Sequence, residues 1–248
     1  TISGTDLIVG ARSGSVNLLL YSVFRIGNAT NNIRWDSFEH FANHRQVKWA
    51  IPISLGDSHR GYRVMGTSTA YFEHYRYARS QALQLAQGRE FADDPFEVVL
   101  GAEVAQALGY GLGEEIVLAH GVATISLVKH DDKPFTVVGI LERTGTPVDR
   151  TLHISLGGME ALHVDWQNGM PARGAAQISA DQVREWASAC SQASRAQTGQ
   201  GESGRGSAVE SSLNEHSEPA FNAAASSAVA CGQALQPKQI TAFMLGLN

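Results

Sequence analysis

Three consecutive residues, Asp57, Ser58 and His59, supply the side-chain types of a nucleophilic triad. In such a triad a carboxylate orients an imidazole, which accepts the proton of the attacking hydroxyl. Functional triads converge from separate chain segments, whereas consecutive side chains on a tight turn point apart. We therefore interpret residues 56–61 as a solvated polar turn at a hairpin tip, and we expect no catalytic residue in the chain.

A second group of chemically competent residues lies further along, at His153, His163 and Asp165. His163 and Asp165 would lie on one side of an extended segment, and imidazole and carboxylate groups are ligands for zinc and copper. Because no third ligand follows at a diagnostic spacing, we expect no bound metal and no cofactor. The alternative is a small hydrolase or metal-binding enzyme in which these three residues converge with His59 in one pocket.

The two cysteines, Cys190 and Cys231, are too far apart in sequence to form a short metal-binding motif. Three interpretations remain open. The cysteines are free thiols in a mobile segment, they form a disulfide in an oxidising compartment, or they have a metal-binding or catalytic role, which their separation disfavours.

Composition indicates a folded domain. Hydrophobic residues make up 43% of the 248 residues and charged residues 17%, values typical of globular chains that bury a core. The formal net charge is −5, and the sequence contains no dense Lys/Arg cluster, which argues against a nucleic-acid partner. No apolar run approaches the roughly 20 residues that a membrane-spanning helix requires.

The stretch from Glu90 to Leu141 organises the rest of the chain. An apolar strand at 96–100 ends at Gly101, and a helix at 102–108 ends at Gly109, which suits the left-handed residue after a helix. Runs rich in β-branched residues then predict a small antiparallel sheet, with strands at 116–119, 123–128 and 135–141.

The flanking segments continue this mixed pattern. Apolar runs predict strands at 6–11, 47–55, 62–67, 151–156 and 240–247, with Pro52 indicating an edge or a bulge. Asn32 is positioned to cap an amphipathic helix whose apolar face carries Ile33, Phe38 and Phe41. The aromatic-rich segment 70–86 is expected to be core. Residues 181–186 could form a short helix, whereas 187–234, rich in Ser, Ala and Gly, predict an unpacked insertion or linker.

The order of four motifs resembles the extracytoplasmic core domain of MacB/FtsX-type ABC transporter permeases. The motifs are Gly88-Arg89-Glu90-Phe91, Gly101-Ala102-Glu103-Val104-Ala105, Gly111-Leu112-Gly113-Glu114-Glu115-Ile116-Val117-Leu118 and Phe135-Thr136-Val137-Val138-Gly139-Ile140-Leu141. Their ordered spacing covers roughly half of the chain.

The resemblance implies an α+β fold with two subdomains. A larger, porter-like βαβ mixed layer would be formed by both chain ends, residues 1–70 and 236–248. A smaller, mainly β, sabre-like subdomain at 71–165 would be inserted in it, and 166–235 would be a low-complexity insertion or linker.

The resemblance also implies a non-catalytic role at the inner membrane, with this segment in the periplasm. ATP hydrolysis by a separate cytoplasmic ABC ATPase would move membrane helices on either side of the segment, and the domain would pass that motion to a substrate. The implied partners are that ATPase, a second permease copy, and a periplasmic adaptor or lipoprotein.

Beside the permease domain and the small enzyme, a third interpretation is a passive binding module that recognises a lipoprotein or peptide through exposed aromatics, such as Trp35, Tyr71 and Tyr75.

Overall fold

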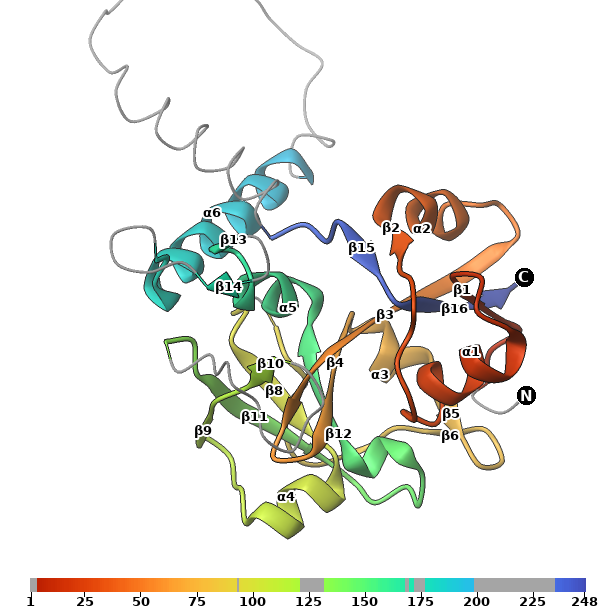
Figure 1. Cartoon of the computed structure of the whole chain (residues 1–248), viewed down its shortest axis with the longest axis horizontal. Helices are drawn as coiled ribbons and strands as arrows, with labels where there is room; N and C mark the ends of the chain where they lie inside the picture. The colour runs from red at the N-terminus through yellow and green to blue at the C-terminus, as the bar shows by residue number, and fades with distance from the viewer. Residues whose placement is uncertain (1–3, 93, 121–131, 168–169, 172–176, 199–234) are drawn as a thin grey trace, which may run out of the picture.

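The computed structural model describes residues 4–92, 94–120, 132–167, 170–171, 177–198 and 235–248. It has a mixed α/β fold, as the sequence predicts, built on a ten-stranded sheet with parallel and antiparallel pairs. Figure 1 shows the helices packed around this sheet and the two chain ends side by side.

The main sheet follows one path through eight strands, with two short strands beside it. The path runs β1 (Leu7–Gly10), β16 (Ala242–Leu247), β3 (Val47–His59), β4 (Tyr62–Thr67), β12 (Thr151–Ser155), β8 (Glu97–Leu100), β11 (Phe135–Leu141) and β7 (Leu85–Gly88). Strand β10 (Ala119–His120) pairs with β3, and β9 (Glu115–Ile116) pairs with β11.

Helices and three small strand pairs complete the described part of the chain. The helices are α1 (Ser15–Ser22), α2 (Trp35–Ala42), α3 (Ala70–His74), α4 (Ala102–Leu108), α5 (Leu156–Leu162), α6 (Ala180–Thr198) and the 3-10 helix η1 (Pro147–Arg150). The small pairs are β2 (Ile33–Arg34) with β15 (Gln239–Ile240), β5 (Arg76–Tyr77) with β6 (Gln81–Ala82), and β13 (Trp166–Gln167) with β14 (Met170–Pro171).

Strand β3 is shared by the two halves of the sheet. Its first part pairs with β16, from Val47 opposite Leu247 to Ile53 opposite Ala242. Its second part pairs with β4, from Ser54 to His59, and with β10. Pro52 lies in the first part of β3, and the predicted edge position is confirmed locally. Pro52 is tolerated there because the pairs with β4 begin only at Ser54, so Pro52 has a strand partner on one side only.

The sheet separates two apolar cores. Along β8, Val98 and Leu100 point into one core and Val99 into the other, so the strand is apolar at every one of these positions. Helices α4, α5 and α6 cover the first core. Helix α3 contributes Tyr71 and Phe72 to the second, which confirms that the aromatic-rich segment is core. A third cluster joins α2 to β16, with the rings of Phe38 and Phe243 5.3 Å apart.

The central motif region folds as a β–α–β unit. Helix α4 has the predicted bounds, and Gly109 adopts the left-handed conformation after it, with φ of 71°. Strand β11 then returns parallel to β8, and among the described residues β7 and β9 pair with it in antiparallel fashion. The predicted antiparallel pairing of the strands after the helix is thus confirmed for β9 and β11, and the parallel pair with β8, which a helical crossover makes possible, is an addition that the sequence did not predict. The expected strand at 123–128 lies outside the described residues.

Two other predictions need correction. Asn32 does not cap α2, because Ile33 and Arg34 first pair with β15 and the helix begins at Trp35. Helix α6 continues to Thr198, well beyond the predicted end near Trp186. Its Ala, Gln and Arg residues favour helix intrinsically, so a helix can form there although few apolar side chains are present. At its start, Val183 is fully buried in the first core.

The glycines and the arginine of the motifs have packing functions. Gly88 has φ of +72°, and a Cβ on it would lie 2.1 Å from the carbonyl oxygen of Val138. A Cβ on Gly101 would lie 2.2 Å from the carbonyl oxygen of Val148. The Arg89 guanidinium binds both oxygens of the Glu97 carboxylate, which is largely buried at the start of β8. The residues of these motifs therefore permit close packing between neighbouring segments, and they have no role in catalysis in this interpretation.

We predict that Gly101→Ala lowers the free energy of unfolding by roughly 3 kcal/mol, because backbone atoms of η1 would have to move. Gly157→Ala is the matched control. Gly157 lies in α5, and its nearest neighbour to a new Cβ is 3.9 Å away, so this change should be neutral or slightly stabilising. Urea unfolding followed by circular dichroism measures both. Equal stability of the two variants would contradict the packing argument.

Candidate functional site

The predicted hairpin tip at 56–61 is wrong, because β3 continues through His59. The turn consists of Arg60 and Gly61 alone, with φ of 48° and 87°, as in a two-residue hairpin of type I′. Asp57 and His59 are therefore buried, with 0% and 6% of their surface exposed. The polar composition of residues 56–59 suggested a turn, although these residues form the end of strand β3.

Asp57, Ser58 and His59 do not form a triad with one another. His59 places Nδ1 2.7 Å from the carbonyl oxygen of Val117 and Nε2 2.9 Å from the hydroxyl of Tyr110. Both ring nitrogens are thus engaged away from Asp57, and burial lowers the pKa of His59. His59 is a structural residue that holds the segment after α4 against β3.

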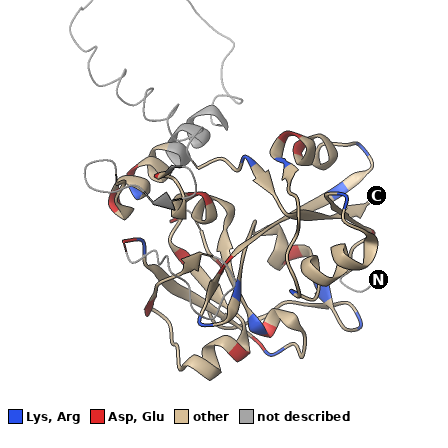
Figure 2. Ribbon diagram, viewed as in Figure 1, with Lys and Arg blue, Asp and Glu red and all other residues tan. Residues whose placement is uncertain are grey.

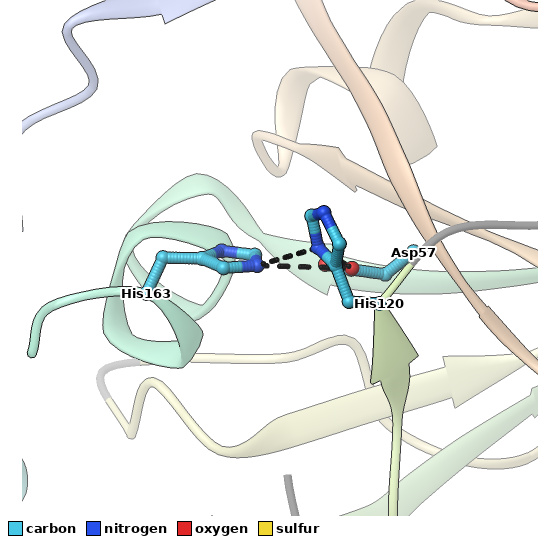
Figure 3. A group of neighbouring side chains, drawn as sticks. All are labelled: Asp57, His120 and His163. Atoms are coloured by element: carbon cyan, nitrogen blue, oxygen red, sulfur yellow. Dashed lines mark hydrogen bonds and ion pairs between the residues drawn. The ribbon is translucent and has the colours of Figure 1, made fainter. Parts of the chain in front are cut away.

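Asp57 instead meets two histidines from distant segments, His120 and His163 (Figure 3). Asp57 Oδ1 lies 3.1 Å from Nδ1 of His120 and 3.8 Å from Nε2 of His163. The same two nitrogens are 3.1 Å apart. One carboxylate oxygen and two imidazole nitrogens therefore converge on a single point.

The topology explains this convergence. His120 is the direct cross-strand partner of Asp57 in the antiparallel pair of β10 and β3, so their side chains share a face. The pairing of β3 with β4 shifts by one residue between Leu55 and Ser58, a β-bulge beside Asp57. His163 is the residue that ends α5, and its ring points toward the other two in Figure 3.

Neighbouring groups orient the two imidazoles. Nδ1 of His163 lies 3.1 Å from the carbonyl oxygen of Met159, which can only accept, so this nitrogen carries the proton. The Nε2 lone pair of His163 then faces Asp57 and His120. The Trp166 ring packs 4.7 Å from both histidine rings, measured between centroids.

Burial and charge differ among the three residues. The Asp57 side chain is fully buried, whereas the side chain of His120 is 49% exposed and that of His163 is 26% exposed. Within the described part of the chain, Oδ2 of Asp57 is buried without a hydrogen-bond partner. The hydrogen bond to Asp57 raises the pKa of His120.

The other residues named from sequence lie elsewhere. His153 is fully buried between the second core and β8, with Nδ1 3.2 Å from the carbonyl oxygen of Val99 and its ring stacked on Tyr71. Asp165 forms a buried ion pair with Lys133, 3.1 Å between Oδ1 and Nζ. The enzyme alternative built on His59, His153, His163 and Asp165 is therefore wrong, because these four do not converge.

Two of the three aromatic residues proposed for a binding module are not exposed. Tyr71 and Tyr75 are buried, at 0% and 4% exposure, so they cannot form an exposed aromatic surface.

The disulfide question stays open, because Cys231 lies outside the described residues. A separate groove of about 790 Å³ lies beside the chain ends and is lined in part by Leu7, Phe41 and Leu247.

The sequence suggested Asp57 only as a triad residue, and it gave no indication that Asp57 or His120 joins this cluster. His120 lies 63 positions from Asp57 and 43 from His163 in the sequence, so no short sequence motif connects the three residues. The only local signal was three polar residues directly after the apolar strand 47–55, which also fits a turn.

Comparisons with known proteins give a family and two distant structures. The model of the family described as MacB-like periplasmic core domain matches residues 3–229. The periplasmic region of MacB from Actinobacillus actinomycetemcomitans is 16% identical, over 64% of this chain and 69% of that one, with a TM-score of 0.41. The extracellular domain of the noncanonic ABC-type transporter YknZ from Gram-positive bacteria is 12% identical, over 52% and 66%, with a TM-score of 0.36. No curated protein matches the sequence.

No helix among the described residues combines the length and the apolar character that a membrane crossing needs. The longest, α6, carries charged and amide side chains throughout.

We predict that Asp165→Asn lowers the free energy of unfolding by about 3 kcal/mol, because it leaves the buried Lys133 ammonium without its buried counter-charge. Asp132→Asn is the matched control. Asp132 contacts the same ammonium at 2.9 Å but is partly exposed, so its loss should cost less than about 1 kcal/mol. Chemical unfolding at neutral pH compares them. Similar losses would show that burial of the pair is unimportant.

We predict that His153 makes the fold sensitive to mild acid. Burial, with a smaller contribution from the Arg25 guanidinium, lowers the pKa of His153 to about 3. Below pH about 6.5, His153 binds a proton in the unfolded chain but stays neutral in the folded chain, so the free energy of unfolding falls as the pH decreases. By pH 5 this linkage amounts to about 2 kcal/mol.

The test compares urea unfolding at pH 7.5 and pH 5. His153→Phe should remove about 2 kcal/mol from the loss between these values, because an aromatic ring of similar size cannot be protonated. The same exchange at His40, which is exposed on α2, should leave the loss unchanged. An unaltered pH dependence in His153→Phe would refute the assignment.

Proposed function

The chain belongs to the family of MacB-like periplasmic core domains, and from this membership we propose that it transmits motion of membrane segments to an extracytoplasmic substrate or partner. In this role the domain is a non-catalytic part of an ABC transporter permease. The energy comes from ATP hydrolysis on a separate cytoplasmic subunit. The domain itself contributes stiffness and a defined route for force.

The pairing of the two chain ends supports this proposal most directly. Strand β1 runs antiparallel to β16, with Leu7 opposite Leu245. The amide of Leu247 also donates to the carboxylate of Asp6. Flanking segments attached to these ends would therefore move the same edge of the sheet (Figure 1).

From this edge, a continuous hydrogen-bonded route leads into the rest of the domain. Strand β16 pairs with β3 along six residues, and β3 continues into the pairs with β4 and β10. Strand β4 then pairs in parallel with β12 over five residues. Apolar cores cover both faces of this route, and close-packed interiors have low compressibility. Displacement of the ends would thus move the distant strands rather than deform the sheet.

We propose the division into subdomains that the sequence suggests. Residues 1–70 and 236–248 would form the larger part, 71–165 the inserted part, and 166–235 the insertion or linker, which includes β13, β14 and α6. The parallel pair of β4 and β12 crosses the boundary between the first two parts. The two parts would therefore share one sheet and move together.

The proposed partners are a cytoplasmic ABC ATPase, a second permease copy, and an adaptor or lipoprotein in the periplasm. In Figure 2, Lys and Arg positions lie among Asp and Glu positions along the described part of the ribbon. The sequence has a formal net charge of −5 and no dense Lys/Arg cluster of the kind that nucleic acids require.

We predict that flexible linkers at both chain ends uncouple the domain. The full-length permease, assembled with its ATPase in nanodiscs, would carry Gly-Ser linkers of about ten residues before residue 4 and after residue 248. Spin labels at Arg79, in the exposed turn between β5 and β6, report the distance between the domains of two copies. Without linkers, this distance should change between nucleotide-free and vanadate-trapped transporter. With linkers, the change should disappear while ATP hydrolysis continues, because flexible chains transmit little force.

A matched control carries the same linker within the hairpin turn at Gly61, away from the chain ends. It should keep both ATP hydrolysis and the distance change. Identical distances in the nucleotide-free and trapped states of the unmodified transporter would refute the mechanical role.

A further inference from the structure

We infer that Asp57, His120 and His163 form a binding site for one divalent transition-metal ion, with Zn²⁺ as the ion that fits best. This inference goes beyond the proposed mechanical role and does not depend on it. It also revises the expectation, drawn from sequence, that the chain binds no metal.

The triangle of donor atoms has the size that a tetrahedral ion requires. Its sides are 3.1, 3.1 and 3.8 Å, joining Oδ1 of Asp57, Nδ1 of His120 and Nε2 of His163. Zinc bonds of 2.0–2.2 Å place two ligands of a tetrahedron about 3.4 Å apart. An ion can therefore sit at bonding distance from all three atoms with only small side-chain movements.

The orientation of His163 is that of a metal ligand. Its Nδ1 donates to the carbonyl oxygen of Met159, so its Nε2 presents a lone pair to the cluster. Metal-bound histidines commonly use the second ring nitrogen in this way, which fixes the tautomer and the ring plane. Nε2 then faces Nδ1 of His120, and both nitrogens face the carboxylate.

Asp57 supplies the independent evidence for a cation. Its side chain is fully buried, and Oδ2 has no hydrogen-bond partner among the described residues. An ion pair with His120 engages Oδ1 only, at 3.1 Å, and leaves the second oxygen uncompensated. Burying such an atom is costly, whereas a metal ion could be bound by either or both carboxylate oxygens.

The donor set selects the class of ion. Two imidazoles and one carboxylate suit zinc and neighbouring transition metals, whereas Mg²⁺ and Ca²⁺ prefer oxygen ligands throughout. Three protein ligands leave one position of a tetrahedron for water or for a donor from another molecule. That position would open on the side of His120, which is half exposed. Trp166 packs against both histidines and restricts water on its own side.

A bound ion would connect three separate elements. Asp57 belongs to β3, His120 to β10, and His163 follows α5. Strand β10 is only two residues long, so a coordination bond would add substantially to its attachment. The ion would fasten this short strand and the end of α5 to the strand that both halves of the sheet share.

The test uses residues 1–248 without a polyhistidine tag and with both cysteines changed to serine, so that neither thiols nor a tag bind metal. After EDTA treatment, Zn²⁺ content following dialysis and Co²⁺ absorption spectra are measured. We expect one Zn²⁺ per chain and a tetrahedral Co²⁺ spectrum. His120→Ala, His163→Ala and Asp57→Asn should each weaken Zn²⁺ binding about 100-fold or more, since even indirect contacts to metal sites contribute 10–100-fold.

His40→Ala is the matched control, because His40 is exposed on α2 and far from the cluster in sequence. It should bind Zn²⁺ like the parent chain and show the same rise in unfolding temperature when Zn²⁺ is added. His120 is half exposed, so His120→Ala is expected to fold, which circular dichroism checks. The inference is overturned if the parent chain retains no more Zn²⁺ than His120→Ala, or if Asp57→Asn and His163→Ala bind as tightly as the parent.

Discussion

The sharing of strand β3 between the two halves of the sheet is the constraint on which the rest of the structure depends. Its first part pairs with the C-terminal strand and its second part with β4 and β10. Since side chains alternate along a strand, a slip of one residue would exchange the faces of both parts at once. The register therefore determines the cores on each side and also the position of Asp57. The bulge between Leu55 and Ser58 changes this alternation locally, directly beside Asp57.

Local structure could be predicted from sequence where neighbouring residues decide it. Helix α4 and its terminal Gly109 follow from helical spacing and from a left-handed residue that glycine suits. The candidate site could not be predicted, because it depends on register between distant segments. Asp57 and His120 meet only because β10 pairs with β3, and His163 joins them only through the end of α5. Polar residues at a strand end resemble a turn until their burial is known, which explains the error at 56–61.

The motifs that indicated the family encode packing rather than binding. Gly88 and Gly101 permit backbone contacts that any side chain would prevent, and Arg89 fixes the carboxylate of Glu97 at the start of β8. Such residues identify a sheet architecture well, and they carry little information about cargo. The Asp57–His120–His163 cluster lies outside all four motifs.

The pairing of β1 with β16 has a consequence for how the chain folds. The amide of Leu247 binds Asp6 across a sequence separation of 241 residues, so this edge of the sheet forms by one of the most non-local contacts that the chain can make. Contacts of this kind form slowly, because the loop between them must close first. While the chain folds, β1 and the first part of β3 therefore have unpaired edges until β16 pairs with both strands. Unpaired strand edges of this kind promote aggregation, so the late pairing of β16 is the step at which this domain is most prone to it.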